Sequence, residues 1–179
     1  MVHHFYFNPF VLLIAITMSQ RASLQALAST SKRISIVRHG QAMHNPRAEV
    51  AKANGCSMEE FIAIMREDDV LDAPLTGLGK EQAKTVTLPT SVSNFDLVVS
   101  SPLSRALQTC DAICPPTEYT ACKRVCCEYF REVNGDLLNA KRRNRSELET
   151  LFPSWDFNDL STEEDSLWTP EIEEFPATA

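Results

Sequence analysis

The sequence predicts an α/β domain whose central sheet is mostly parallel. Three observations predict this fold class: short apolar runs typical of buried strands, helix-capping signals between them, and an alternation of strand and helix along the chain. With 179 residues, of which 44% are hydrophobic, the chain is long enough to bury the core of one domain. Ligands of such sheets bind beyond the carboxyl ends of the strands, so a site is expected where the strands end.

Two apolar runs predict buried strands. Residues 33–37 form the first run, which is rich in β-branched side chains and is followed by a turn at Gly40. Residues 97–99 form the second. An arginine follows each run. Arg38 comes directly after the first run, and Arg105 lies at the start of the helix predicted after the second. The carboxyl ends of parallel strands share one edge of a sheet, so we expect both arginines in one site.

Capping patterns predict three helices. Ser57 and Glu60 form a capping-box pattern ahead of a helix with an apolar face. Thr76 is expected to cap a short helix that extends through Val86. A third helix is expected over residues 103–113, where two prolines then prevent its continuation.

Charge is unevenly distributed along the chain. Residues 1–145 contain all 17 lysines and arginines together with 14 acidic residues, whereas residues 146–179 contain 10 acidic residues and no basic one. A pI of about 5.1 opposes the broad basic face that nucleic-acid binding requires. The composition therefore favours a small anionic partner over nucleic acid, and it leaves the oligomeric state open.

The apolar run over residues 10–18 is too short to span a membrane as a helix. It resembles the apolar part of a secretory signal, with a possible cleavage site at Ala26-Leu27-Ala28, but no lysine or arginine precedes it. An organelle transit peptide and a plain extension are the alternatives. We expect a cytoplasmic protein, unless residues 1–28 act as a targeting segment.

Four motifs together resemble the histidine phosphatase superfamily, and the greatest similarity is to its phosphoglycerate mutase-like branch. In chain order the motifs are Val37-Arg38-His39-Gly40 with Asn45, residues 72–83, residues 99–109, and Arg131-Glu132-Val133-Asn134-Gly135. The resemblance implies a three-layer α/β/α domain of phosphoglycerate mutase type over residues 32–170. An N-terminal extension or targeting segment over residues 1–31 would precede it, and an acidic tail over residues 171–179 would follow.

The resemblance implies a phosphate site in which His39 is the nucleophile. Arg38 and Arg105 match the family's phosphate-binding arginines, and Asn45 matches a neutral donor in the same site. Glu132 matches the acid that protonates the leaving group. A guanidinium binds a phosphate dianion bidentately, and a neutral imidazole attacks phosphorus to form a phosphohistidine. Since the arginines supply electrostatic stabilisation, neither a metal ion nor a cofactor is implied.

Some residues have structural alternatives. Arg38 has the alternative of a salt bridge to Asp72 or Asp96, and Glu128 is an alternative to Glu132 as the acid. The six cysteines show no paired metal-ligand spacing, and we expect buried or free thiols.

Other polar groups are interpreted as supporting structure. His44 is expected to support the loop after the first strand, whereas its neighbour Asn45 is the stronger candidate for ligand contact. Lys141-Arg142-Arg143 is predicted to form a solvated basic loop, with contact to a second substrate anion as the alternative.

The sequence departs from the family pattern near its end. The resemblance implies a second histidine in a short motif after a late strand, but no histidine follows His44. The chain is therefore expected to be a C-terminally truncated member that lacks the last elements of the fold. The expected function is phosphomonoester hydrolysis through a phosphohistidine, impaired by the missing histidine. Phosphoglycerate mutase-type phosphoryl transfer and non-catalytic phosphate binding are the alternatives.

Overall fold

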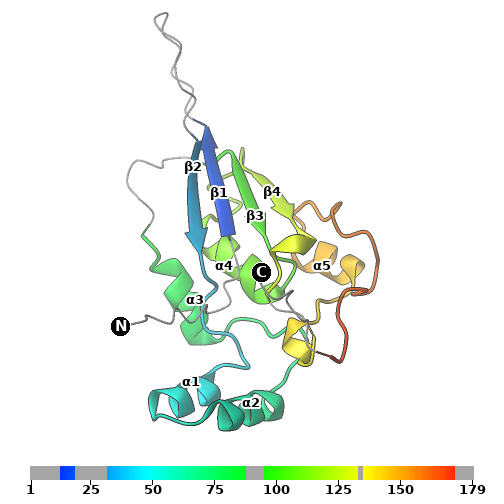
Figure 1. The fold of residues 1–179 in the computed structure, drawn as a ribbon. Coiled ribbons are helices and arrows are strands. Elements are labelled where there is room, and N and C mark those ends of the chain that lie inside the picture. Colours follow the sequence, from blue (N-terminus) through cyan, green and yellow to red (C-terminus); the bar gives the residue numbers. More distant parts are fainter. Residues whose placement is uncertain (1–12, 19–31, 88–94, 133–134, 172–179) are drawn as a thin grey trace, which may run out of the picture.

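The computed structural model describes residues 13–18, 32–87, 95–132 and 135–171. Its four-stranded sheet has the order β2 (Lys32–Val37), β1 (Leu13–Met18), β3 (Leu97–Ser100) and β4 (Lys123–Cys126). β3 and β4 are parallel, whereas β1 is antiparallel to both of its neighbours, so β2, β3 and β4 run in one direction (Figure 1). The predicted α/β class is confirmed. The prediction of a mostly parallel sheet is not, because β3 and β4 form the one parallel pair among the described strands and β1 pairs antiparallel on both sides.

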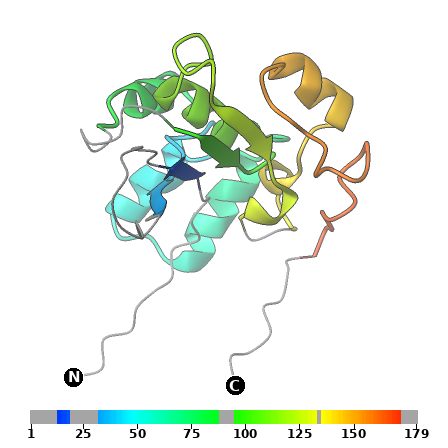
Figure 2. The same ribbon diagram turned by 90° about the horizontal axis from the view of Figure 1, so that it is seen from above.

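The described helices are α1 (Pro46–Ala53), α2 (Met58–Glu67), α3 (Gly77–Lys84), α4 (Ser104–Ile113) and α5 (Arg145–Leu151), with short 3-10 turns at Glu128–Phe130 and Leu138–Ala140. Helices α3 and α4 lie on one face of the sheet, and α1 and α2 lie beyond the carboxyl end of β2 (Figures 1 and 2). The prediction that residues 33–37 form a buried strand is wrong on one side of β2, because Ile34 and Ile36 are 55% and 62% exposed and alternate with partly buried neighbours.

The predicted helix starts are confirmed. The side chain of Ser57 accepts a hydrogen bond from the backbone N of Glu60, and the carboxylate of Glu60 accepts one from the backbone N of Ser57, which completes the capping box of α2. Thr76 Oγ1 accepts from the backbone N of Gly79 at 3.0 Å and caps α3. Helix α4 ends at Ile113, before the two prolines. The sequence patterns do not predict α1, α5, β4 or β1.

Strand β1 lies within the segment expected to be an extension or targeting segment. Its register places Ala15 opposite Ser35 of β2 on one side and opposite Val98 of β3 on the other. Within the described residues, β2 has no pairing with β3, so the backbone hydrogen bonds of β1 join β2 to the rest of the sheet. The position of His39, two residues after β2 ends, therefore depends on β1.

Replacing Ala15 by proline should lower the free energy of unfolding far more than replacing it by glycine. Proline lacks a backbone N–H and is not tolerated in a central strand, whereas glycine keeps the hydrogen bonds and costs roughly 1 kcal/mol. Chemical denaturation of Ala15→Pro and Ala15→Gly measures the difference. Equal stabilities of the two variants would contradict a central position for β1.

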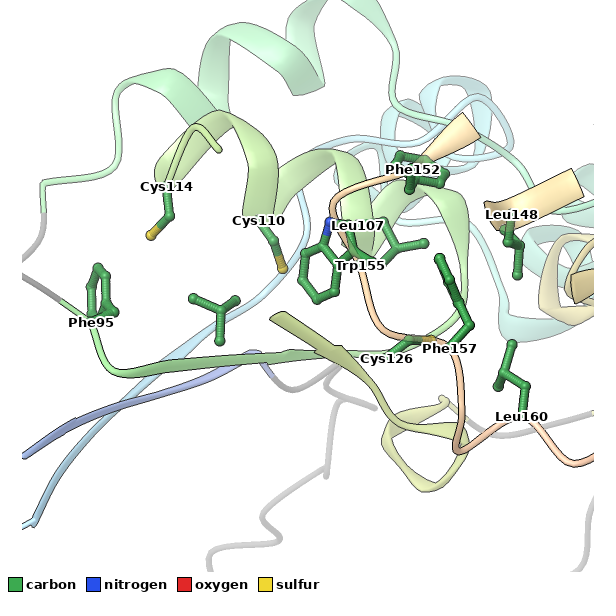
Figure 3. Close-up of a cluster of buried hydrophobic side chains, with 11 residues drawn as sticks. Phe95, Leu107, Cys110, Cys114, Cys126, Leu148, Phe152, Trp155, Phe157 and Leu160 are labelled. Atoms are coloured by element: carbon green, nitrogen blue, oxygen red, sulfur yellow. The ribbon is translucent and has the colours of Figure 1, made fainter. Parts of the chain in front are cut away.

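The core lies between α4 and the sheet and continues to α5. Figure 3 shows its buried side chains, which are Phe95, Val98, Leu107, Cys110, Cys114, Cys126, Leu148, Phe152, Trp155, Phe157 and Leu160. Full burial of a side chain such as Leu107 contributes about 1.5–3 kcal/mol. This packing fixes α4 on the sheet and so positions Arg105 in its first turn.

The six cysteines are free thiols, as expected from their spacing. Burial raises the pKa of Cys110 and Cys114 to about 12, which keeps both thiols protonated at neutral pH. In the part of the chain that the structure describes, no cluster of three or more His, Cys, Asp or Glu is arranged to hold a metal ion. None of the described helices has the length and apolar character needed to cross a membrane.

Candidate functional site

The turn after β2 is packed directly against the start of α3. A β-carbon at Gly40 would clash with the carbonyl oxygen of Gly79, and a β-carbon at Gly79 would clash with that of Gln41. The backbone N of Thr76 donates to the carbonyl of Gln41 at 2.9 Å. The backbone N of Gly40 donates to Thr109 of α4 at 3.2 Å. These contacts fix the backbone on both sides of His39.

His39 is a neutral imidazole with a defined tautomer. Its Nδ1 lies 2.6 Å from the carbonyl oxygen of Gly40. Because a carbonyl oxygen only accepts, Nδ1 carries the proton and Nε2 keeps its lone pair. Burial, followed by the positive charge of Arg105 and then that of Arg38, lowers the pKa of His39 to about 3. The ring is therefore uncharged at neutral pH and has one nitrogen available as a nucleophile.

Arg105 is the most deeply buried charge near His39. It is only 1% exposed. Its two terminal nitrogens donate to the carbonyl of Asn139 at 2.6 Å and to Glu132 Oε2 at 3.2 Å. Its Nε is buried and has no hydrogen-bond partner among the described residues. Since an unpaired buried donor costs about 1–3 kcal/mol, this nitrogen is suited to an acceptor that the protein itself does not supply.

His44 belongs to the same group of side chains. It is 4% exposed, and burial, then Arg105, then His39, then Arg38 lower its pKa to about 3. We call Arg38, His39, His44 and Arg105 the His39 cluster. Arg38 is the exposed member, and its charge acts on both imidazoles. The charges of Arg38 and Arg105 thus act on both His39 and His44, whereas the predicted roles of these residues in a phosphate site stay predictions.

Glu132 and Asn45 lie at the border of the cluster. Glu132 contacts Arg105, whereas the alternative acid, Glu128, pairs with Arg131 at 2.9 Å and Arg142 at 3.2 Å. Asn45 directly follows His44 and is buried, and its Oδ1 accepts from the backbone N of Ala42 at 3.0 Å. Its Nδ2 has no hydrogen bond to any described residue, so this amide remains a donor.

Asp72 fixes the start of α4. Its buried carboxylate accepts from the backbone N of Ser104 at 2.7 Å and from the hydroxyl at 2.5 Å. Burial raises the pKa of Asp72 to about 6. The ion-pair partner of Asp72 is Arg143, at 3.4 Å, which corrects the alternative that Asp72 pairs with Arg38.

The predicted solvated basic loop is wrong for Arg142. This residue is only 2% exposed. Its guanidinium donates to the carboxylate of Glu128 and to the backbone carbonyls of Arg143, Thr162, Glu163 and Glu164. Burial is tolerated because each nitrogen has an acceptor. Arg142 thus ties the loop to residues 162–164 and has no donor nitrogen left for a second anion.

A family model supports the resemblance in the motifs. The model of the histidine phosphatase superfamily (branch 1) matches residues 34–177. The chain belongs to this superfamily. The match includes every member of the His39 cluster together with Asn45 and Glu132.

The curated relatives that this chain matches are longer proteins. Phosphoglycerate mutase-like protein 1 of Arabidopsis thaliana is 30% identical over 172 residues, which cover 80% of this chain and 57% of that protein. A probable phosphoglycerate mutase of Arthroderma benhamiae is 27% identical over 169 residues, which cover 85% of this chain and 49% of that protein. The chain spans about half the length of the curated relatives it matches. No solved structure matches the chain.

Replacing His44 by glutamine should reduce the loss of stability on acidification. In the folded protein the pKa of His44 is about 3, whereas the unfolded chain takes up a proton near pH 6.5. Because the unfolded state then binds more protons, stability falls as the pH drops below 6.5, by up to about 1.4 kcal/mol per pH unit for each such histidine. His39 adds a second such loss, while protonation of Asp72 below its raised pKa of about 6 offsets part of it in both proteins.

Chemical denaturation of wild type, His44→Gln and Met43→Gln at about pH 7 and about pH 5 measures this effect. Met43 lies in the same loop and is exposed, so Met43→Gln should follow the wild type. The free energy of unfolding of His44→Gln should fall by about 1–2 kcal/mol less than that of the wild type. Parallel pH slopes in all three proteins would show that His44 is not held neutral.

Proposed function

We propose that this protein is a phosphatase that cleaves small phosphate monoesters through a phosphohistidine at His39. The observation that carries the proposal is a neutral imidazole with its Nε2 lone pair available, beside the buried guanidinium of Arg105. A phosphate monoester carries close to two negative charges at neutral pH. Arg105 and Arg38 supply positive charge next to the nucleophile, which favours a dianionic phosphoryl group there.

The first step forms a nitrogen–phosphorus bond. Nε2 of His39 donates its lone pair to phosphorus while the ester P–O bond breaks and its electron pair leaves with the alcohol oxygen. That oxygen takes a proton from the carboxyl group of Glu132, which lies beside Arg105. In the second step, water attacks phosphorus, the P–N bond breaks, and the carboxylate of Glu132 accepts the proton from water. Inorganic phosphate and the free imidazole result.

The charges of the cluster are used in both steps. Arg105 and Arg38 lower the barrier by stabilising the phosphoryl oxygens, and the amide of Asn45 is proposed as a further neutral donor to them. The Gly40 carbonyl keeps the Nδ1 proton of His39 in place and stabilises positive charge on the ring as the bond forms. No step in this sequence calls for a redox reaction.

Phosphoglycerate mutase-type transfer is the second candidate, because relatives of the chain are named for phosphoglycerate mutase. It shares the first step, but the phosphoryl group then passes to a hydroxyl of a phosphorylated acceptor instead of water. We favour hydrolysis, since the cluster supplies charge for one phosphoryl group and Arg142 is fully engaged within the protein. We also propose that the complete domain has the three-layer phosphoglycerate mutase-like arrangement.

Trapping should reveal a phosphohistidine at His39. A short incubation with a radiolabelled phosphomonoester, followed by denaturation in alkali, should leave label on the wild-type chain, because a P–N bond survives alkali and hydrolyses in acid. His39→Gln should carry no label. The label is counted on the protein and then located by peptide mapping.

Binding measurements decide between the catalytic and the non-catalytic alternative. Orthovanadate should bind the wild type and fail to bind Arg105→Leu, as judged by calorimetry. A wild-type chain that binds orthovanadate but never acquires label would overturn the phosphatase proposal and support non-catalytic phosphate binding. Product analysis separates phosphatase from mutase activity, because a phosphatase releases inorganic phosphate whereas a mutase forms an isomeric phosphate ester.

Glu132→Gln should slow substrates with poor leaving groups more than substrates with good ones. An alkoxide leaving group needs a proton as the P–O bond breaks, whereas p-nitrophenolate leaves without one. Loss of a general acid costs typically 10²- to 10⁴-fold, so kcat/KM for an alkyl phosphate should fall by roughly that factor. The value for p-nitrophenyl phosphate should change much less. A uniform decrease for both substrates would indicate that Glu132 only positions Arg105.

A further inference from the structure

Two buried polar groups of the His39 cluster have no hydrogen-bond partner among the described residues. One is Nε of Arg105, and the other is Nδ1 of His44. Both side chains are more than nine-tenths buried, at 1% and 4% exposure. Neither ring nitrogen of His44 makes a hydrogen bond to a described residue. Buried polar groups are satisfied in the great majority of cases, so two exceptions in one cluster point to a common ligand.

We propose that His44 is a second phosphate-binding imidazole, which donates a hydrogen bond directly to an oxygen of the phosphoryl group that Arg105 holds. This inference rests on the proposed function and assigns His44 a part in it. The neutral ring always carries one N–H, on Nδ1 or on Nε2, so it is a donor in either tautomer. A hydrogen bond to a charged oxygen is about twice as strong as one between neutral groups.

The charges around His44 explain why a dianion suits this position. The charged and titratable groups that act on the ring are Arg105 in α4 and Arg38 and His39 in the turn after β2. None of them is an acid, and the nearby acid Glu132 is already bonded to Arg105. A bound dianion would cancel the repulsion from the arginines and favour a second proton on the His44 ring. His44 then gains a charge-assisted hydrogen bond when the phosphate binds.

Support of the loop is the competing interpretation of His44. A supporting histidine normally bonds a backbone carbonyl or a carboxylate through its ring. Here other groups hold the loop. Oδ1 of Asn45 accepts a hydrogen bond from the backbone N of Ala42, and the backbone N of Met43 donates to the carbonyl oxygen of Pro74 at 2.9 Å. The His44 ring takes part in none of these bonds. Its remaining polar capacity is therefore available to a ligand.

Titration with inorganic phosphate and orthovanadate tests the assignment. The full-length chain is labelled at the histidine rings with carbon and nitrogen isotopes, and its ring signals are followed by NMR. The His44 signals should move toward those of the charged imidazolium when either anion binds. Calorimetry should show that His44→Gln binds both anions roughly 10- to 100-fold more weakly than wild type. Met43→Gln, from the same loop, should bind like wild type.

The outcomes separate this inference from the proposed function. If wild type binds neither anion, the proposed function fails and the role of His44 fails with it. If wild type binds both anions while the His44 ring signals stay in place and His44→Gln binds equally well, only the role of His44 is overturned. Should His44→Gln fail to fold, as judged by its thermal transition, the NMR titration of the wild-type chain decides alone.

Discussion

The burial of one charge, the guanidinium of Arg105, determines the properties of the site. Removing such a charge from water costs several kcal/mol unless partners compensate. Asn139 and Glu132 provide two of these partners, both from the segment that follows β4. The same charge lowers the pKa of His39 and His44, where only burial has a larger effect. Arg105 therefore connects α4 with the segment after β4 through hydrogen bonds, and its charge keeps the imidazoles of His39 and His44 unprotonated.

Arg142 shows that burial alone does not make an arginine a ligand-binding group. Arg105 and Arg142 are almost equally buried. Every nitrogen of Arg142 donates to a protein acceptor, so its charge serves to hold residues 162–164 on the domain. Nε of Arg105 instead has no hydrogen-bond partner within the described ranges. The difference in remaining hydrogen-bonding capacity separates the structural arginine from the one that suits a phosphate.

The sequence predicts those features of the fold that depend on neighbouring residues. The Ser57 capping box, the Thr76 cap and the strands before Arg38 and Ser101 are local patterns. Long-range features are missed: β1 has an apolar run that fits a leader equally well, and its strand conformation depends on pairing with β2 and β3. The burial of Arg142 depends on carbonyls some twenty residues away. Arg105 and Glu132, which the motifs assign to one site, are in contact, while their catalytic roles stay predictions.

The imidazoles of His39 and His44 differ in one contact, the hydrogen bond from Nδ1 of His39 to the Gly40 carbonyl, and this contact gives them different proposed roles. The Gly40 carbonyl fixes the proton of His39 on Nδ1, so Nε2 keeps its lone pair for the proposed attack. In the described part of the chain no acceptor fixes the ring of His44, so its proton can sit on whichever nitrogen faces an anion. A dianion between them weakens the repulsion from Arg105 for both rings. In the proposed reaction, His39 attacks as a neutral group because its lone pair becomes the new bond, whereas His44 is proposed to stabilise the phosphoryl oxygens as a donor.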